Sequence, residues 1–387
     1  MKERLVIKNF GPIKSVDLEL GKMTILIGEQ ATGKSTIAKV LAVCRYFSFI
    51  TTIEQTNITS SFGSGLRAWG LDGMTNLNSQ IEYYCNDYDL IVNYQPWNIR
   101  MLEDSGDRDI NAKVFSPKLT AKSERFMGLL EDLKNIESIS VMSQIPPSFF
   151  QKNVINVMDN PFFFPTERGL QSIFSLGKSS IQNISDSLYN QFAKMDMFAK
   201  SFPNETDIIP LNLTYKNING QGFIKNERQI EFSSLYNGAS GYKSTIPIIL
   251  TIKHYSENRK KSKTFIVEEP ELNLFPKAQK KLIEFFVENV NENGHSFLLP
   301  THSPYVLSAL NDLLMAYKKG QKNPEEVKKV VKKEYWLNPE ELSVYELKDG
   351  KATSIVDRKL NLISENILDD VSDEMNDEFD MLLDIES

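Results

Sequence analysis

The chain has 387 residues and a formal net charge of −7; 41% of its residues are hydrophobic and 25% are charged. This composition is typical of a globular protein with a sizeable core, and the negative charge argues against a protein that coats nucleic acid over its whole surface. No run approaches the roughly 18 apolar residues of a membrane span, and the N-terminus lacks the apolar stretch of a secretion signal. Cys44 and Cys85 show neither disulfide nor metal-site spacing. We therefore expect a cytoplasmic protein that does not act at a membrane.

The first residues predict the start of an α/β domain. Alternating polar and apolar residues predict paired strands at 5–9 and 16–20, separated by a turn at 10–12. An apolar run at 23–27 predicts a buried strand, and a helix is expected from Ser35 to about residue 46.

Between that strand and that helix lies the pattern G-x-x-x-x-G-K-[ST], formed by Gly28, Gly33, Lys34 and Ser35. Such a loop wraps a pyrophosphate with its backbone N–H groups, and glycines let the backbone approach the phosphates. The lysine places a positive charge on the β- and γ-phosphates, the serine hydroxyl binds Mg²⁺, and the helix N-terminus adds N–H donors. A glycine-rich turn with a chance lysine is the alternative, which the order strand, loop, helix disfavours. The predicted ATP-binding residues of this phosphate-binding loop are Gly28, Glu29, Gln30, Ala31, Thr32, Gly33, Lys34, Ser35 and Thr36.

The middle of the chain is less regular. Residues 47–160 contain strand-like segments at 81–84 and 90–94 and an amphipathic helical pattern at 123–136, so we expect an α+β insertion of unknown role. Sustained heptads are absent, which excludes a long coiled coil. Beyond it the pattern predicts, in chain order, a helix at 179–200, strands at 208–216 and 222–232, a helix from Tyr242, a strand at 264–268, a helix at 276–290, a strand at 296–300 and a helix from Tyr305.

Two carboxylates, Glu268 and Glu269, end the strand predicted at 264–268. A parallel sheet presents its ligand-binding residues at the carboxyl ends of its strands, so both residues would face the phosphate-binding loop. Glu268 fits the metal ligand that holds Mg²⁺, usually through water, and Glu269 fits the residue that orients or deprotonates the attacking water. An exposed charged turn at the end of a core strand is the alternative.

A histidine, His302, follows the next predicted strand in the segment PTHSPYVL. Its imidazole can donate a hydrogen bond to a γ-phosphate oxygen or to the attacking water. The alternative is a histidine that only caps a helix start, and Ser303 and Pro304 at the helix entry are compatible with both interpretations.

Together these motifs resemble the ABC-type ATPase heads of the SMC, RecF and OLD-like group, in particular its short bacterial ATPases. The resemblance rests on LVIKNFGPIKSVDLEL, GEQATGKST, EEPELNLFP and THSPYVL, and it covers roughly the first 45 residues and residues 230–315. It implies an α/β fold, namely an ABC-ATPase-like head with a mixed β-sheet and flanking helices. In such heads a serine-glycine pair at a helix start caps the γ-phosphate of the ATP held by a second protomer. Ser240 and Gly241 stand at the matching place, although Ala-Ser-Gly alone is also a common turn.

The chain departs from the family pattern in several places. Tyr242 and Lys243 follow the glycine where the family often carries Gln or Glu. The metal ligand in many ABC ATPases is Asp rather than Glu, although related OLD-like heads use Glu. The glutamine that normally senses Mg²⁺ has no clear counterpart, and Gln80 is a candidate only. Arg168, in FFFPTERGL, has two interpretations, a contact to a phosphate or partner carboxylate and a surface salt bridge, of which the second is favoured.

We expect four parts: residues 1–46 carry the loop, 47–160 form the insertion, 161–335 complete the head, and 336–387 form a strand pair and an acidic amphipathic helix. The lysine-rich segment 322–336 is interpreted as a solvated face rather than a nucleic-acid contact. Apolar residues of the C-terminal segment recur at helical spacing, which predicts a helix docked on the head or on a partner. These residues are Ile367, Leu368, Val371, Met375, Phe379, Leu382 and Leu383.

These features predict a slow ATPase that uses ATP and Mg²⁺ and works as a switch. The resemblance implies a homodimer or higher oligomer, in which each site combines the loop, Glu268, Glu269 and His302 of one chain with Ser240 and Gly241 of another. It also implies sensing of DNA or other nucleic acid in anti-phage defence or DNA repair. A separately encoded effector protein is expected, because the chain shows no nuclease motif. Two alternatives are a weakly hydrolysing scaffold that sequesters a toxic partner and an ABC transporter subunit, which the long insertion disfavours.

Overall fold

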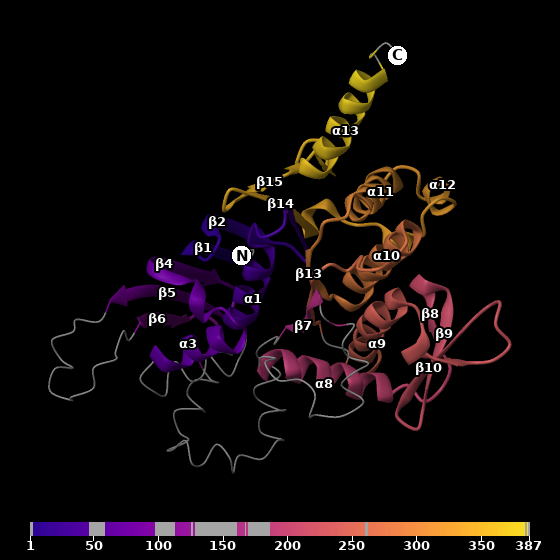
Figure 1. Cartoon of the computed structure of the whole chain (residues 1–387), viewed down its shortest axis with the longest axis horizontal. Helices are drawn as coiled ribbons and strands as arrows, with labels where there is room; N and C mark the ends of the chain where they lie inside the picture. Colours follow the sequence, from indigo (N-terminus) through magenta and orange to yellow (C-terminus); the bar gives the residue numbers. More distant parts are fainter. Residues whose placement is uncertain are drawn as a thin grey trace. The chain divides into compact units, whose positions relative to one another are not determined.

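The computed structural model describes residues 3–45, 59–96, 113–124, 127, 161–166, 168, 186–259, 262–383 and 385. The chain divides into two compact units, which are coloured along the sequence in Figure 1. The first unit comprises residues 1–20, 30–161 and 348–352, and the second comprises 21–29, 162–347 and 353–387. Most of the helix predicted at 123–136 lies outside the described residues.

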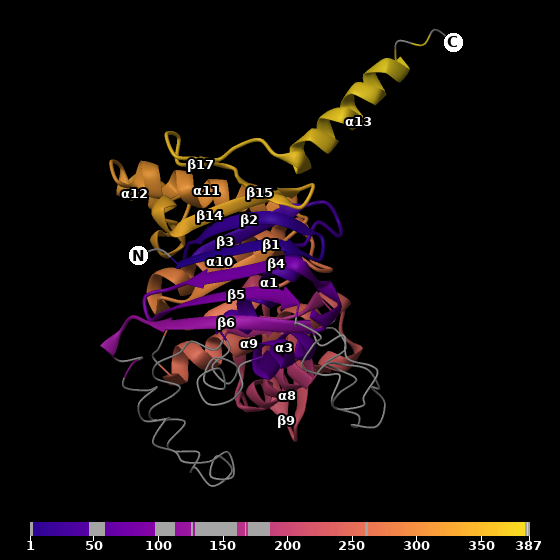
Figure 2. The same cartoon turned by 90° about the vertical axis from the view of Figure 1, so that its left-hand side faces the viewer.

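The strands of the first unit form an antiparallel sheet in the order β6-β5-β4-β1-β2, which Figure 2 shows face on. Its strands are β1 (Glu3–Phe10), β2 (Ile13–Leu20), β4 (Thr75–Tyr84), β5 (Tyr88–Pro96) and β6 (Lys113–Ala121), and β15 (Lys351–Ser354) pairs with β2 in parallel. In β2 buried residues largely alternate with exposed ones, because one face of the strand is covered. The strands predicted at 5–9, 16–20, 81–84 and 90–94 are confirmed.

Helix α1 (Lys34–Arg45) covers part of this unit, together with α3 (Thr59–Ala68) and the short turn η1 (Asp72–Met74). Nine of its twelve residues are buried. The Tyr88 hydroxyl of β5 donates to the carbonyl oxygen of Cys44 at 2.8 Å, which ties the end of the helix to the sheet. The helix predicted from Ser35 is confirmed, one residue earlier than expected.

A parallel sheet in the order β14-β3-β13-β12-β7 lies at the centre of the second unit. Its strands are β3 (Met23–Gly28), β7 (Phe162–Phe164), β12 (Thr264–Val267), β13 (Ser296–Pro300) and β14 (Leu342–Lys348). Side chains of β3 and β12 are buried throughout, as expected for parallel strands that are covered on both faces. The predicted α/β fold class is therefore confirmed.

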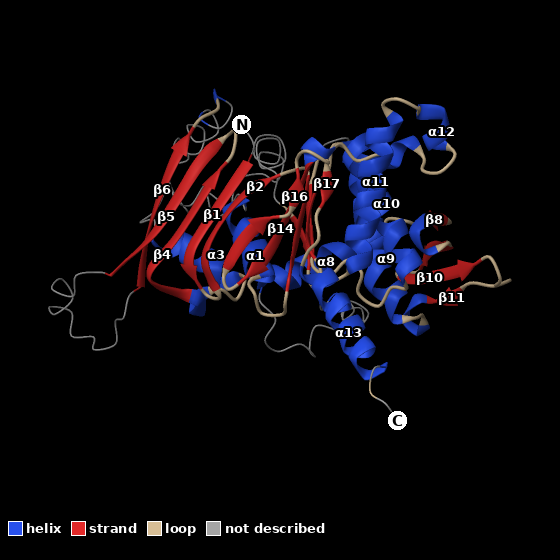
Figure 3. Ribbon diagram, turned by 90° about the horizontal axis from the view of Figure 1, so that it is seen from above, coloured by secondary structure: helices blue, strands red, loops and turns tan. Residues whose placement is uncertain are grey.

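Four longer helices surround that sheet and share its apolar core: α8 (Asp186–Lys200), α9 (Ser240–Arg259), α10 (Pro276–Asn293) and α11 (Pro304–Gly320). In Figure 3 α10 and α11 run side by side, and α8 packs against α9. Proline begins both α10 and α11, where a missing N–H costs nothing, and Gly294 ends α10 in the left-handed region. Within the described ranges no helices wind into a long coiled coil, as predicted.

A small antiparallel sheet in the order β11-β10-β9-β8 completes the second unit, and here two predictions need correction. Its strands are β8 (Thr206–Ile208), β9 (Leu213–Ile218), β10 (Gln221–Asn226) and β11 (Ser233–Ser234). The strand predicted at 208–216 is interrupted by the turn η7 (Ile209–Leu211), because Pro210 cannot donate to a neighbouring strand and Asn212 is left-handed. The strand predicted at 222–232 ends at Asn226, whose side chain accepts from the N–H of Arg228 in a turn.

The C-terminal segment contains β16 (Val356–Asp357), β17 (Leu362–Ile363) and the predicted helix, α13 (Ile367–Leu383). Ile367 and Leu368 pack against the core, but five described apolar side chains farther along α13 are 60–72% exposed, namely Met375, Phe379, Met381, Leu382 and Leu383. Figures 1 and 2 show the far end of α13 projecting from the rest of its unit. The distal half of the helix is therefore not docked on its own unit.

The lysine-rich segment forms the short helix α12 (Pro324–Lys328) and two turns, η9 (Lys333–Tyr335) and η10 (Pro339–Glu341). Lys328 and Lys329 pair with Glu325 and Glu326 at 2.7 Å, and all four side chains are exposed. This arrangement agrees with a solvated face. Among the helices of the described residues, none is both long and apolar enough to cross a membrane.

Candidate functional site

The central parallel strands of the second unit bring several predicted site residues to one edge. Strands β3, β13 and β12 are consecutive neighbours and all parallel, so their carboxyl ends coincide. Just beyond these ends the N–H of Thr301 donates to the carbonyl oxygen of Leu26 at 2.9 Å, and the N–H of Glu269 donates to that of Pro300 at 2.8 Å. The start of the phosphate-binding loop, the two glutamates and His302 therefore follow strand ends at the same edge.

The phosphate-binding loop has the backbone that its glycines predict. Gly28, Ala31 and Gly33 have φ angles of 141°, 61° and 105°, in the region that glycine adopts without strain. A Cβ atom on Gly33 would lie 3.0 Å from the Ile13 side chain, which would have to shift slightly to make room. Glu29, Gln30 and Ala31 are exposed, and Lys34 is buried at the start of α1. Successive backbone N–H groups in such a turn form an anion-binding concavity.

Glu268 and Glu269 lie in different environments although they are neighbours. Glu268 is only 4% exposed, and its N–H donates to the carbonyl oxygen of Phe164 at 3.0 Å. The Glu269 side chain is 35% exposed, and its Oε1 lies 3.9 Å from Nε2 of His302, which is 32% exposed. Glu269 has a φ of 44°, an unusual value that costs a non-glycine residue about 1–3 kcal/mol and tends to occur at functional sites. The structure thus places an accessible carboxylate and an accessible imidazole side by side.

A third carboxylate, Glu271, organises the segment that carries His302, although the sequence did not single it out. Its Oε1 accepts from the Thr301 hydroxyl at 2.7 Å and from the His302 N–H at 2.9 Å. Burial is the main cause that raises the pKa of this carboxyl above its ordinary value. Glu271 is the last residue of EEPE, two positions after Glu269, so the motif contained it. Only its contact with the residues that follow the next strand shows what it does.

The beginning of α9 places Ser240 and Gly241 next to the segment that follows β12. Ser240 is exposed, whereas a Cβ atom on Gly241 would lie 2.5 Å from the carbonyl oxygen of Asn273. The Ser244 hydroxyl donates to the carbonyl oxygens of Gly241 and Leu272, both at 3.1 Å. The glycine therefore permits a backbone-to-backbone contact that leaves Ser240 facing outward.

Arg168 is not the surface residue that the sequence favoured. Its side chain is fully buried, and its nitrogens donate to four main-chain carbonyl oxygens, those of Pro165, Ser244, Glu268 and Glu269. Neither a surface salt bridge nor a contact to phosphate fits this position. A guanidinium satisfies several acceptors at once, which explains why an arginine is tolerated in the interior.

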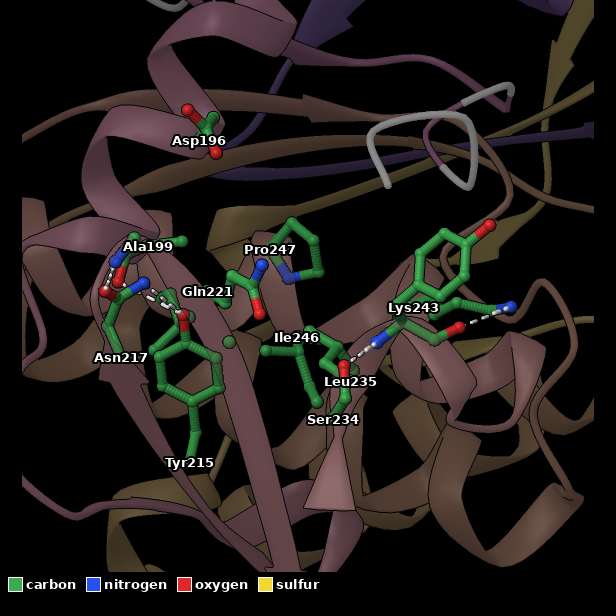
Figure 4. A pocket seen from close by; sticks show the side chains of 14 residues that line it. Asp196, Ala199, Tyr215, Asn217, Gln221, Ser234, Leu235, Lys243, Ile246 and Pro247 are labelled. Carbon is green, nitrogen blue, oxygen red and sulfur yellow. Dashed lines mark hydrogen bonds between the residues drawn. The ribbon is translucent and has the colours of Figure 1, made fainter. Parts of the chain in front are cut away.

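A cavity of about 360 Å³ adjoins the first turns of α9. Its lining residues come from α8, β9, β10, β11, α9 and the short helix η8 (Leu235–Asn237), and Figure 4 shows apolar side chains such as Ile246 and Pro247 among them. The Tyr215 hydroxyl donates to the carbonyl oxygen of Ala199 at 3.2 Å, and burial raises the pKa of this hydroxyl. None of the sequence motifs predicted this cavity.

Gln80, the candidate Mg²⁺ sensor, and His295, a histidine outside the motifs, both have structural partners. Gln80 lies within β4, and its side-chain amide donates to Oε1 of Glu82 at 2.5 Å, so the structure offers no support for a role in sensing Mg²⁺. His295 is fully buried, with Nδ1 accepting from the Lys263 N–H and Nε2 lying 3.1 Å from the Ser256 hydroxyl. No group of three or more His, Cys, Asp or Glu side chains able to hold a metal occurs among the described residues.

The donors present nevertheless fit Mg²⁺ bound together with a nucleotide. Mg²⁺ is commonly held by one or two protein oxygens, with phosphate and water oxygens completing its octahedron. In the second unit Glu268 offers a buried carboxylate at the sheet edge. In the first unit Ser35 offers an exposed hydroxyl in the first turn of α1. A site of this kind needs no cluster of protein carboxylates.

Comparison with known proteins gives a family for the chain. A model of the AAA ATPase domain matches residues 72–307, more than half of the chain. A search of curated protein sequences found no significant match.

Solved SMC head domains are among the similar structures. The SMC head domain from Thermotoga maritima is 11% identical with a TM-score of 0.42, and the match covers 92% of this chain and 98% of that one. An SMC head bound to the C-winged helix domain of ScpA is 11% identical with a TM-score of 0.43, and the match again covers 92% of this chain and 98% of that one. A third, an SMC head with an extended coiled coil bound to the C-terminal domain of ScpA from Pyrococcus furiosus, gives 10% and 0.40, covering 91% and 95% of the two chains. On the strength of the domain match, the chain belongs to the AAA ATPase domain family.

Proposed function

We propose that this chain is an ATP-dependent switch whose two copies close around ATP and separate after slow hydrolysis. The observation that carries the proposal is the convergence of Glu268, Glu269 and His302 with the end of β3 at one edge of a parallel sheet. The residues that follow β3 form the loop with the phosphate-binding pattern.

Each residue has a role that its position supports. Backbone N–H groups of residues 28–36 bind the phosphates, and Lys34 neutralises charge on the β- and γ-phosphates. Ser35 and Glu268 would hold Mg²⁺, which would supply positive charge at the phosphate oxygens. Glu269 accepts a proton from the attacking water, and its partial exposure gives water access to the carboxylate. His302, 3.9 Å from that carboxylate, donates to the γ-phosphate or to the same water.

Closure of two copies would complete each site with Ser240 and Gly241 from the partner. Ser240 is exposed at the N-terminus of α9, where the helix N–H groups and the helix dipole favour an anion. The γ-phosphate contributes contacts that exist only in the closed dimer, so ATP shifts the equilibrium toward closure. ADP lacks those contacts, and the dimer opens after hydrolysis.

The output of the switch is nucleic-acid sensing or the control of a separately encoded effector, in anti-phage defence or DNA repair. The resemblance of the motifs to the SMC, RecF and OLD-like group supports this part of the proposal. The exposed apolar residues of α13 also offer a surface on which an effector protein can bind.

Three variants test the nucleotide chemistry. Lys34→Ala should abolish ATP binding, whereas Glu269→Gln should bind ATP normally, hydrolyse it at least 100-fold more slowly and accumulate as a dimer. Glu325→Gln removes an exposed glutamate that pairs with Lys328 and should behave as wild type. Light scattering measures dimerisation, and phosphate release measures hydrolysis. Hydrolysis by Glu269→Gln at the wild-type rate would show that Glu269 is not the base.

Measurements of dimerisation and phosphate release also distinguish a switch from a scaffold. Wild-type turnover at background with tight, Mg²⁺-dependent dimerisation would favour a scaffold that sequesters a partner. Purification of the Glu269→Gln form from the native host, with and without ATP, identifies the output. A protein or nucleic acid retained only with ATP supports the switch.

A further inference from the structure

We propose that Arg168 is a positioning residue that couples the first turns of α9 to the carboxylates that follow β12. This inference rests on the proposed function, because it assigns Glu268 and Glu269 to hydrolysis and Ser240 to the partner's ATP. It adds to that function a chain of contacts through which closure of the dimer changes the positions of the Glu268 and Glu269 carboxylates.

The guanidinium joins these two segments directly. Nε donates to the carbonyl oxygen of Ser244 at 3.1 Å. On the other side, Nη1 donates to the carbonyl oxygen of Glu268 at 2.6 Å and Nη2 donates to that of Glu269 at 2.5 Å. Nη1 also donates to the carbonyl oxygen of Pro165 at 3.1 Å, which anchors the side chain close to its own backbone. All three nitrogens are thus used, and the side chain is fully buried.

The hydrogen bond from Arg168 is made to the main chain of Glu269, a residue with a strained backbone conformation. Glu269 has a φ of 44°, which a residue with a Cβ atom keeps only where its surroundings hold it. Its N–H is held by Pro300, and its carbonyl oxygen accepts from both Arg168 and the N–H of Leu272. A change in the position of Arg168 therefore changes the direction in which the Glu269 carboxylate points.

The other end of the link is the part of α9 that would meet the partner. Ser244 lies one turn after Ser240, and Gly241 in the same turn packs against the carbonyl oxygen of Asn273. When Ser240 binds the γ-phosphate held by another copy, any shift of this turn reaches Ser244. The rigid, planar guanidinium passes the shift on to the main chain of both glutamates.

An arginine is required for this role. Lysine keeps the positive charge but has one nitrogen at the end of a flexible stem, so it cannot span carbonyl oxygens on two segments with fixed geometry. Arg168→Lys should therefore preserve the fold and weaken the link. A role restricted to filling the interior would lower stability without changing the balance between binding and turnover.

The test compares Arg168→Lys with Arg358→Lys, a matched change at an arginine whose Nη1 donates to one main-chain carbonyl oxygen, that of Pro339. For Arg168→Lys we expect KM for ATP within 3-fold of wild type and kcat at least 10-fold lower at a temperature well below its melting transition. With Glu269→Gln in the same chain, the ATP-dependent dimer should still form. Arg358→Lys should retain wild-type kcat. A kcat for Arg168→Lys within 2-fold of wild type would overturn the coupling.

Hydrogen exchange on the wild-type chain provides a second test that needs no variant at Arg168. A non-hydrolysable ATP analogue with Mg²⁺ should slow amide exchange in residues 240–246 and 268–272 together, by at least 5-fold relative to ADP. Protection of only one of the two segments would refute the link. Absence of ATP binding by the wild-type chain refutes the proposed function itself, whereas wild-type turnover by Arg168→Lys refutes only the coupling.

Discussion

Replacing Gly241 by alanine tests whether the start of α9 must lie directly against the backbone of residue 273. The new Cβ atom would lie 2.5 Å from the carbonyl oxygen of Asn273, whereas ordinary contacts of this kind begin at about 3.4 Å. A backbone atom cannot rotate away as a flexible side chain can. The two segments must therefore separate by roughly 0.9 Å.

The expected cost has a structural and a functional part. Overpacking of this kind costs about 1–3 kcal/mol, which lowers the melting temperature of a unit of this size by roughly 2–10 °C. The separation also stretches the bond from the Ser244 hydroxyl to the carbonyl oxygen of Leu272, now 3.1 Å. Because a misplacement of about 1 Å can reduce turnover about 100-fold, kcat should fall more than stability alone explains.

Thermal unfolding followed by circular dichroism and steady-state phosphate release measure the two parts. Gly73→Ala is the matched control, since a Cβ atom there meets nothing within 4 Å and its backbone is not left-handed. The control should melt within 2 °C of wild type and hydrolyse ATP normally. If Gly241→Ala melted and hydrolysed ATP as the control does, the close backbone contact would not constrain the site.

Three further outcomes are expected. Ser240→Ala should leave the melting temperature and ATP binding unchanged, because Ser240 is exposed, but it should weaken ATP-dependent dimerisation at least 5-fold in light scattering. Burial raises the pKa of Glu271 above its ordinary value of 4.5. Between the pKa of the unfolded chain and the higher pKa of the folded chain, only the folded chain keeps this proton. The free energy of unfolding therefore falls as pH rises from 4.5 through the folded-state pKa. Glu271→Gln removes this titration, so the melting temperature of the variant should rise relative to that of wild type as pH increases from 4.5. A difference in melting temperature that does not change with pH would contradict the argument. Phe379→Ser, at a 60% exposed position of α13, should change the free energy of unfolding by less than about 0.5 kcal/mol in urea titrations, and a larger loss would show that the helix packs on the chain.

The backbone of the predicted phosphate-binding loop agrees with the sequence pattern, because that pattern is local. Glycines, lysine and serine stand at fixed offsets between an apolar strand and a helix, and the φ angles of Gly28 and Gly33 agree with that pattern. Elements with strong periodicity were also predictable, as the strand at 296–300 and the helix from residue 276 show. Predictions failed where a turn interrupted the strand pattern, at Ile209–Leu211 and after Asn226.

Residues whose role depends on distant contacts could not be assigned in this way. Glu271 belongs to a visible motif, but its contact with the His302 N–H joins positions 31 residues apart. The pairing of β4 with β1 likewise extends a sheet across a long stretch of chain that looked like a separate insertion.

Arg168 shows the difference most clearly. As a charged residue near the end of an apolar segment it was interpreted as a surface group, since an ionised side chain is rarely buried without partners. Three of its four carbonyl acceptors are 76, 100 and 101 residues away. A sequence pattern cannot reveal a carbonyl acceptor, because every residue has a carbonyl group. The sequence by itself determined the chemical groups of the proposed nucleotide site, because side-chain types and short spacings are encoded locally. Only the tertiary structure decided how they are held, because it alone brings distant backbone atoms within hydrogen-bonding distance.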